Sequence, residues 1–304
     1  ETAGDNTGFA GATTIAGGTV TLGDNAALGT GAVTVSGGSL DLNGKTIVNG
    51  VTVSGGTLTG GTIAVDKVSA NSGTIAAKLT GSAAFVKSVA GDVLLTGAND
   101  FTGGVEVSAG KVTVGSASAL GASTNVLTLS ATGTVDLNGR SATLSGLAGT
   151  GGELTNADVA TAATVTLSGS TDTTFAGVIS GNLGVAKTGS ATQTLSGANL
   201  FTGGVSVTGG TLAAGSNTAL GAGDVTIAGG TLDLTGTTGA GIANLVTLTS
   251  GALTGGKIAL SQVTLVAGSV STQLTGSAGL TKTNAAALTL SGANTFEGGV
   301  TVGG

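Results

Sequence analysis

The fold is decided by one stretch of sequence, Val33-Thr34-Val35-Ser36-Gly37-Gly38-Ser39-Leu40-Asp41-Leu42. Apolar residues alternate with Thr, Ser or Asp on both sides of the Gly-Gly pair, which is the period of a β-strand with one buried face. The two glycines allow a sharp corner that side chains would obstruct. The stretch therefore predicts two short strands joined by a glycine corner. Similar doublets occur at Ile15–Leu22, Val51–Leu58, Val205–Leu212 and Val225–Leu234.

Where these doublets are adjacent, the same pattern starts again at a nearly constant spacing, as at Ile15, Val33 and Val51. Such a spacing of roughly 18 to 20 residues, with short strands and tight corners, is typical of one coil of a β-solenoid. Parallel crossovers are right-handed in nearly all proteins. We therefore predict an all-β fold, a right-handed parallel β-helix with about 15 coils, and essentially no helix.

The composition agrees with this fold and excludes several others. The 304 residues include 60 Gly but no Pro, Cys, His, Met, Trp or Tyr, and only 8% are charged. Collagen requires proline, and disordered chains have few β-branched residues. Every apolar run is too short to cross a membrane. The chain begins at Glu1 without a basic and apolar leader, so we expect a processed or excised piece rather than a signal peptide.

A longer repeat of about 95 residues contains the short one. Its clearest copies are 95–107, 195–207 and 290–302, each with Asn, Phe and a Gly pair, and a Lys precedes each Phe at one constant separation. A degraded copy begins at Asp5. We predict one continuous solenoid over residues 1–304, with super-repeats at about 9–100, 101–200 and 201–295 and a partial repeat at 296–304. The recurring positions are Lys87, Asn99, Phe101, Gly103, Gly104, Lys187, Asn199, Phe201, Gly203, Gly204, Lys282, Asn294, Phe296, Gly298 and Gly299.

Three segments, Phe85–Val112, Leu183–Leu212 and Gly279–Val302, resemble the autotransporter-associated β-strand repeat, also called the passenger-associated transport repeat. The resemblance covers about a third of the chain, and this chain has Phe where that family often has Tyr. It implies a β-helical passenger that is secreted across the outer membrane, and therefore an extracellular or cell-surface location. It also implies an adhesin stalk or related structural element.

Catalytic and metal-binding patterns are absent from the sequence. Without His or Cys, the usual nucleophile systems and zinc sites are excluded. Asp41, Asp136 and Asp233 share one phase of the long repeat and are therefore too far apart for a shared substrate. The one local group of acids is Asp92, Asp100 and Glu106, which we interpret as solvated charges. Gly-Asp-Asn at 4–6 and 23–25 is ordinary turn chemistry. We therefore predict no enzyme, no cofactor, no metal and no binding of nucleic acid.

The recurring residues have a structural interpretation. We expect the three repeat asparagines to satisfy backbone groups or to form a side-chain ladder. The repeat phenylalanines are predicted to fill the core at a wide corner, and the repeat lysines to mark a solvated turn. Thr-x-Thr occurs at five places without constant spacing, which gives only weak support to ice binding.

The predicted function is a structural, non-catalytic segment of a bacterial fibre, stalk or surface filament. The chain opens and closes in the same repeat phase and shows no capping element, so head-to-tail association with itself, or with flanking repeats of a longer chain, is expected. Two alternatives stay open: an adhesin passenger that binds host or environmental glycans, and an ice-binding rod.

Overall fold

The computed structural model describes residues 6–64, 67–82 and 84–303. Asp5, in the degraded repeat copy, lies outside these residues. Contacts divide the chain into two compact units, Glu1–Ala142 with Gly151–Leu154, and Thr143–Thr150 with Thr155–Gly304. The two units together contain about 14 parallel coils of a β-solenoid, which confirms the predicted fold class. The right-handed turn and the super-repeat boundaries stay predictions.

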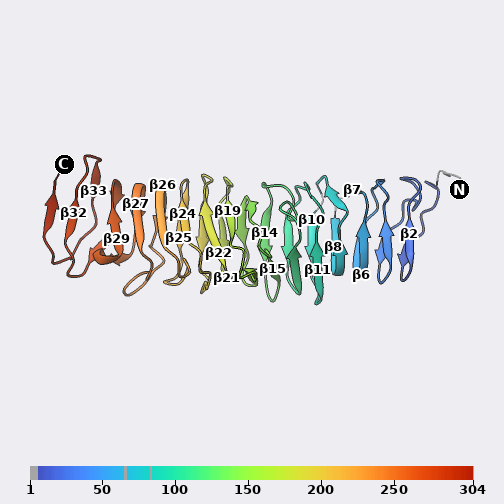
Figure 1. Cartoon of the computed structure of the whole chain (residues 1–304), viewed down its shortest axis with the longest axis horizontal. Helices are drawn as coiled ribbons and strands as arrows, with labels where there is room; N and C mark the ends of the chain where they lie inside the picture. The colour runs from blue at the N-terminus through green and yellow to red at the C-terminus, as the bar shows by residue number, and fades with distance from the viewer. Residues whose placement is uncertain (1–5, 65–66, 83, 304) are drawn as a thin grey trace. The chain divides into compact units, whose positions relative to one another are not determined.

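Unit 1 is made of short parallel strands (Figure 1). They are β1 (Thr13–Ile15), β2 (Thr19–Thr21), β3 (Val33–Val35), β4 (Ser39–Asp41), β5 (Thr46–Ile47), β6 (Val51–Thr59), β7 (Thr62–Ala64), β8 (Lys67–Ile75), β9 (Lys78–Thr80), β10 (Ala84–Lys87), β11 (Asp92–Leu95), β12 (Val105–Val107), β13 (Lys111–Val114), β14 (Val126–Leu129) and β15 (Thr134–Asp136). Strands β16 (Ala142–Leu144) and β18 (Glu153–Asn156) have residues in both units.

Unit 2 has the same construction and one short 3-10 segment, η1 (Leu260–Gln262), the only helical element among the described residues. Its strands are β17 (Gly146–Ala148), β19 (Ala163–Leu167), β20 (Thr173–Phe175), β21 (Val178–Gly181), β22 (Leu183–Lys187), β23 (Thr192–Leu195), β24 (Val205–Val207), β25 (Thr211–Ala214), β26 (Val225–Asp233), β27 (Val246–Thr254), β28 (Lys257–Ala259), β29 (Val263–Leu265), β30 (Gly268–Val270), β31 (Gln273–Thr275), β32 (Leu280–Lys282), β33 (Leu288–Leu290) and β34 (Val300–Val302).

The core of each unit is a set of columns in which one apolar residue lies over another in the next coil. In unit 1 a column runs through Val33, Val51, Val68, Phe85, Val105 and Leu127. In unit 2 a column runs through Val165, Val185, Val205, Val225, Val246 and Val263. Apart from Val263, which is half-buried, these residues are buried. Each buried valine contributes about 1.5–3 kcal/mol of transfer free energy, so the columns stabilise the stacking of the coils.

The Gly-Gly pairs form two kinds of bend. In three of the doublets the pair separates two strands, and Gly18 and Gly210 have positive φ values of 68° and 56°. In β6 and β26 the strand continues through the glycines instead. Register shifts accompany both of these strands, at Val53/Ser54 and at Ile227/Ala228. A bulge bends the strand without ending it, so the glycines need not form a corner there.

Candidate functional site

Two of the three repeat asparagines, Asn99 and Asn199, are buried and join three successive coils. The backbone N–H of Leu79 donates to Oδ1 of Asn99 at 2.9 Å, and Nδ2 of Asn99 donates to the carbonyl of Ala119 at 2.7 Å. Asn199 repeats this pattern with Ile179, at 2.8 Å, and Ala219, at 2.6 Å. The partners lie 20 residues away in each direction, which is one coil before and one coil after. The amide side chains therefore link neighbouring coils by hydrogen bonds and do not face solvent.

The third asparagine is held less tightly. The N–H of Leu274 donates to Oδ1 of Asn294 at 2.9 Å, and Asn294 is only half-buried. The neighbouring phenylalanines follow the same trend. Phe101 and Phe201 are fully buried, as the core interpretation expected, whereas Phe296 is half-buried.

The solvated-turn interpretation of the repeat lysines is wrong, because all three side chains are buried. Lys87, Lys187 and Lys282 are 0%, 2% and 7% exposed. The alternation Phe85-Val86-Lys87 places Lys87 on the same inward face as Phe85, and a strand has no way to turn that side chain outward. The ammonium groups are satisfied inside the corner: Nζ of Lys87 donates to the carbonyl of Val89, and Nζ of Lys187 to that of Gly189.

The glycine corners make room for these ammonium groups. A methyl group on Gly110, which has a φ of +70°, would lie 2.5 Å from Nζ of Lys87. Burial lowers the pKa of Lys87 and of Lys187 below the usual lysine value of 10.5, and the carboxylates of Asp92 and Asp172 act in the opposite direction. The lysines are thus part of the interior and are not available to a ligand.

Because of these two lysines, Lys87 and Lys187, we expect the free energy of unfolding to increase in alkaline solution. Their pKa values are lower in the folded chain than in the unfolded chain, so the unfolded chain binds more protons as the pH approaches 10.5. The free energy of unfolding therefore rises with pH in that window. Urea unfolding at intervals from pH 7 to 10.5 measures it, without interference from Cys or Tyr, which the chain lacks.

The control for this prediction is a pair of variants. The double variant Lys87→Met/Lys187→Met is expected to lose the alkaline rise. Lys257→Met, at an exposed position, should keep it. A rise that persists in the double variant contradicts the assignment to these two lysines.

Some of the repeat glycines lie where neighbouring coils approach closely. A methyl group on Gly203 would lie 2.5 Å from the carbonyl oxygen of Leu183, and one on Gly298 would lie 2.3 Å from the amide nitrogen of Gly279. Gly104 has a φ of +89°. By contrast, a methyl group on Gly299 would meet no atom within 4 Å. Close approach is therefore the requirement at Gly203 and Gly298, a left-handed backbone is the requirement at Gly104, and neither applies at Gly299.

The repeated aspartates serve turns. Oδ1 of Asp41, Asp136 and Asp233 accepts the backbone N–H two residues later, at 2.8, 3.0 and 2.9 Å. Asn43 and Asn138, which supply two of these N–H groups, both have a φ of +49°. Asp136 is buried, with only 4% of it exposed. Its burial is compensated by an ion pair with Lys111 at 2.7 Å.

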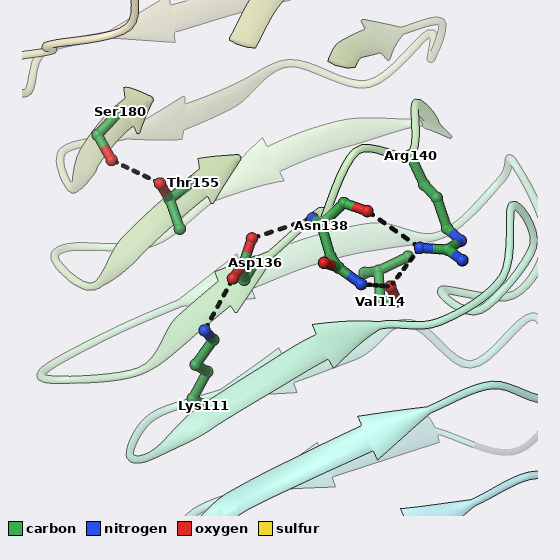
Figure 2. A network of polar contacts seen from close by, with 7 residues as sticks. All are labelled: Lys111, Val114, Asp136, Asn138, Arg140, Thr155 and Ser180. Carbon is green, nitrogen blue, oxygen red and sulfur yellow. Dashed lines mark hydrogen bonds and ion pairs between the residues drawn. The ribbon is translucent and has the colours of Figure 1, made fainter. Parts of the chain in front are cut away.

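Figure 2 shows the polar network around this ion pair. Nδ2 of Asn138 donates to the carbonyl of Val114 at 3.4 Å, and Nη1 of Arg140 donates to the carbonyl of Asn138 at 3.0 Å. Separately, in unit 2, the Ser180 hydroxyl donates to Thr155 at 2.8 Å. The network in unit 1 ties the turn to the preceding coil.

This ion pair is expected to contribute more than the exposed pair elsewhere in the unit. Lys111→Met should cost about 1–3 kcal/mol, since it removes the cation that pairs with a carboxylate whose side chain is only 5% exposed. Lys78→Met is the matched control: it breaks the pair with Asp100, whose side chains are 44% and 54% exposed, and should cost less than about 0.5 kcal/mol. Equal losses in chemical denaturation would contradict this ranking.

The acids that lie close together in the sequence are not brought together. Lys111 pairs with Asp136 and Asp100 pairs with Lys78, and a hydrogen bond from Lys78 holds the pKa of Asp100 below its usual value. Among the described residues, no three acidic side chains gather in a way that could hold a metal ion. No helix in the described part of the chain is long and apolar enough to span a membrane.

Two kinds of buried amide were missed from the sequence. Nδ2 of Asn125 donates to the carbonyls of Phe101, at 2.9 Å, and Leu120, at 3.0 Å, and Asn49 and Asn244 bind loop carbonyls in the same way. A signal was present, since each of these asparagines precedes an inward residue, Val51, Leu127 or Val246, by two positions.

Gln193 is the second case, and it links strands that are distant in the sequence. Its Oε1 accepts the N–H of Leu147 at 3.0 Å, and its Nε2 donates to the Leu147 carbonyl at 2.8 Å. The partners are 46 residues apart. The sequence did contain a sign of this role. Gln193 is polar, whereas the corresponding residues of the other super-repeats, Val93 and Leu288, are apolar.

One surface depression has the size of a ligand site. It lies in unit 2 over β19, β22, β24 and the start of β26, with a volume of about 630 Å³. Gly184 and Gly204 are in register and leave its floor without side chains, while Thr164 and Asp224 lie at its two ends. No aromatic side chain lines it.

Comparison with known proteins finds similarity to one repeat family and to one adhesin. The passenger-associated transport repeat family matches residues 2–22, 85–114, 185–214 and 280–304. The adhesin BmaC autotransporter of Brucella suis biovar 1 (strain 1330) is 43% identical over 93 residues, which are 31% of this chain and 3% of that adhesin. No solved structure matches. These similarities point to an extracellular or cell-surface location. Four segments of the chain thus match the passenger-associated transport repeat, and they are set in a parallel β-solenoid.

Proposed function

We propose that the chain is a structural, non-catalytic segment of a bacterial surface passenger, working as a stalk or fibre. The observation that carries this proposal is that the repeat asparagines and lysines make their hydrogen bonds inside the stack of coils. Asn99 and Asn199 direct both ends of their amide groups at neighbouring coils, and Lys87 and Lys187 are buried. The residues that recur most faithfully therefore build the stack. The match to the passenger repeat supports the same role.

The test separates a stalk from an adhesive surface. The purified chain is coupled to beads, and the beads are applied to a glycan array and to epithelial cells. A stalk segment is expected to give no saturable binding to either. Saturable binding that soluble chain competes away would overturn the stalk proposal and favour the adhesin alternative.

We also propose that another parallel coil stacks on strands β33 and β34, supplied by a second copy or by flanking repeats. Val300 and Val302 are 57% and 74% exposed, although the matching residues of β24, Val205 and Val207, are buried. Covering two such valines is favourable by about 1.5–3 kcal/mol each. Sedimentation velocity should show association that grows with concentration. Val300→Asp/Val302→Asp should abolish it, whereas Val159→Asp, at a position 90% exposed elsewhere, should not.

Glycan binding is the second candidate, and the depression over Gly184 and Gly204 is the observation that favours it. Backbone groups and the hydroxyls of Thr164 and Ser206 could bind sugar hydroxyls there. If the bead experiment detects a glycan, Ala186→Arg should fill the depression and abolish binding. The matched variant Val86→Arg, at the corresponding position of the earlier super-repeat, should leave binding unchanged.

A further inference from the structure

One pair of neighbouring coils in unit 2 is joined on two faces and open on the third. On one joined face, β30 pairs with β33 from Gly268↔Leu288 to Val270↔Leu290. On the other, the Leu274 N–H donates to Asn294. On the third face, β29 pairs with β27 and β32 pairs with β34, but among the described residues no strand pairing joins β29 to β32. Figure 1 shows these strands in the orange to red part of the chain.

A pocket of about 300 Å³ occupies the position where that pairing is missing. Residues 263–266 line it from the β29 side, and Gly279–Thr281, Thr283 and Asn284 line it from the β32 side. None of its lining side chains is charged, and the apolar ones include Val263, Leu265 and Leu280. We call this opening the β29–β32 slot.

The equivalent strands in unit 1 are closed. The segment 246–302 repeats the segment 51–107 at a constant offset, so that Val263 corresponds to Val68 and Leu280 to Phe85. In unit 1, Val68 and Phe85 lie in register, as part of the β8–β10 ladder. The same segment of sequence therefore forms a continuous ladder in one unit and a slot in the other.

The backbone groups that face the slot follow from the alternation along each strand. Inward residues donate their N–H to the following coil, as Val185 does to Gly204 at 3.0 Å. Outward residues donate to the preceding coil, as Thr208 does to Lys187 at 2.9 Å. By this rule the N–H of Leu265 and the N–H groups of Thr281 and Thr283 point into the slot. Thr281 and Thr283 are at exposed positions, and unpaired N–H groups along a strand edge form a template for pairing with another strand.

We propose that the β29–β32 slot is an acceptor for an extended, uncharged peptide strand of a partner protein, with Val or Leu alternating with Thr or Ser. An extended backbone supplies donors and acceptors to two facing strand edges at once. In a sheet, the added strand lies about 4.8 Å from each of its two neighbours. The absence of charged lining residues selects against a charged segment. The alternation matches the inward and outward faces of β29 and β32. This inference is independent of the stalk proposal.

Amide hydrogen exchange, resolved by residue, is the first test, and unit 1 supplies the control. The amides of Leu265, Thr281 and Thr283 are expected to exchange at least 100-fold faster than those of Ala70, Val86 and Ser88, which occupy the same positions in the earlier copy of the segment. Adding the synthetic peptide GVTVTG at about 1 mM, a concentration that populates even a weak complex, should slow the three slot amides and leave the three control amides unchanged. Slow exchange without peptide, or no protection with it, overturns the proposal.

Proline variants give the second test. Thr281→Pro removes one N–H that faces the slot, so the chain should fold normally and lose at least 10-fold in affinity for GVTVTG. Val86→Pro removes the corresponding N–H from a closed ladder and should lower the midpoint of unfolding. The peptide GVPVTG should not bind the unmodified chain, a readout that does not depend on any variant folding. Equal binding of both peptides, or unchanged affinity in a folded Thr281→Pro variant, would show that no strand is being added.

Discussion

Replacing Gly197 with alanine should destabilise unit 2 by about 3 kcal/mol or more, among the largest effects of any single methyl group in the chain. The added Cβ would lie 1.8 Å from the carbonyl oxygen of Gly177 and 2.8 Å from its carbon. Both atoms belong to the backbone of the preceding coil, so no side-chain rotation can relieve the overlap. The coils must separate at this corner, and the hydrogen bonds beside it must lengthen.

Urea or thermal unfolding measures this effect, and Gly299→Ala is the matched control. A Cβ on Gly299 meets nothing within 4 Å, and its φ is not positive, so that variant should change the free energy of unfolding by less than about 0.5 kcal/mol. Equal effects of the two variants would mean that stability here depends on glycine's backbone freedom and not on the close approach of two coils. At the corresponding positions Gly97 and Gly292, an added Cβ would lie 2.3 Å from a carbonyl oxygen. Their alanine variants should therefore lose about as much stability as Gly197→Ala.

The fold was predictable because its rule is local and repeated. The alternation in Val33–Leu42 determines which residues face inward, and the spacing of the doublets determines which strands stack. Neither requires knowledge of distant contacts. The same alternation also held the information that Lys87 points inward. That conclusion was missed because charge was given more weight than position in the strand.

Other features depend on contacts that no local pattern specifies. The 46-residue link from Gln193 to Leu147 exists only once the coils are stacked. The opening between β29 and β32 occurs in a segment whose earlier copy is closed, so the period alone predicts a continuous ladder at both places. The depression over Gly184 and Gly204 likewise depends on two glycines lying in register.

Asn199→Ala is expected to destabilise the chain strongly, because it leaves two buried backbone groups without partners. These groups are the N–H of Ile179 and the carbonyl of Ala219. Each costs about 1–3 kcal/mol when its hydrogen bond is lost in the interior, so the two together should cost about 2–6 kcal/mol. Asn199→Asp should be no better, because it keeps the acceptor for Ile179 but loses the donor to Ala219 and introduces a buried charge.

The third copy of the repeat supplies the control. It tests whether the loss of stability comes from the hydrogen bonds of the amide or from any substitution at this position. Asn294 has the same sequence context but is half-buried and makes one cross-coil bond from its side chain, with the N–H of Leu274. Asn294→Ala should therefore cost about 1 kcal/mol, measured by the same urea titration. If the two alanine variants lost equal stability, the number of coils that the amide joins would not explain why asparagine recurs. If Asn199→Ala lost more unfolding free energy than Asn294→Ala, the hydrogen bonds of this residue to the coils on both sides would explain why it recurs once in each super-repeat. No ligand would be needed to explain the recurrence.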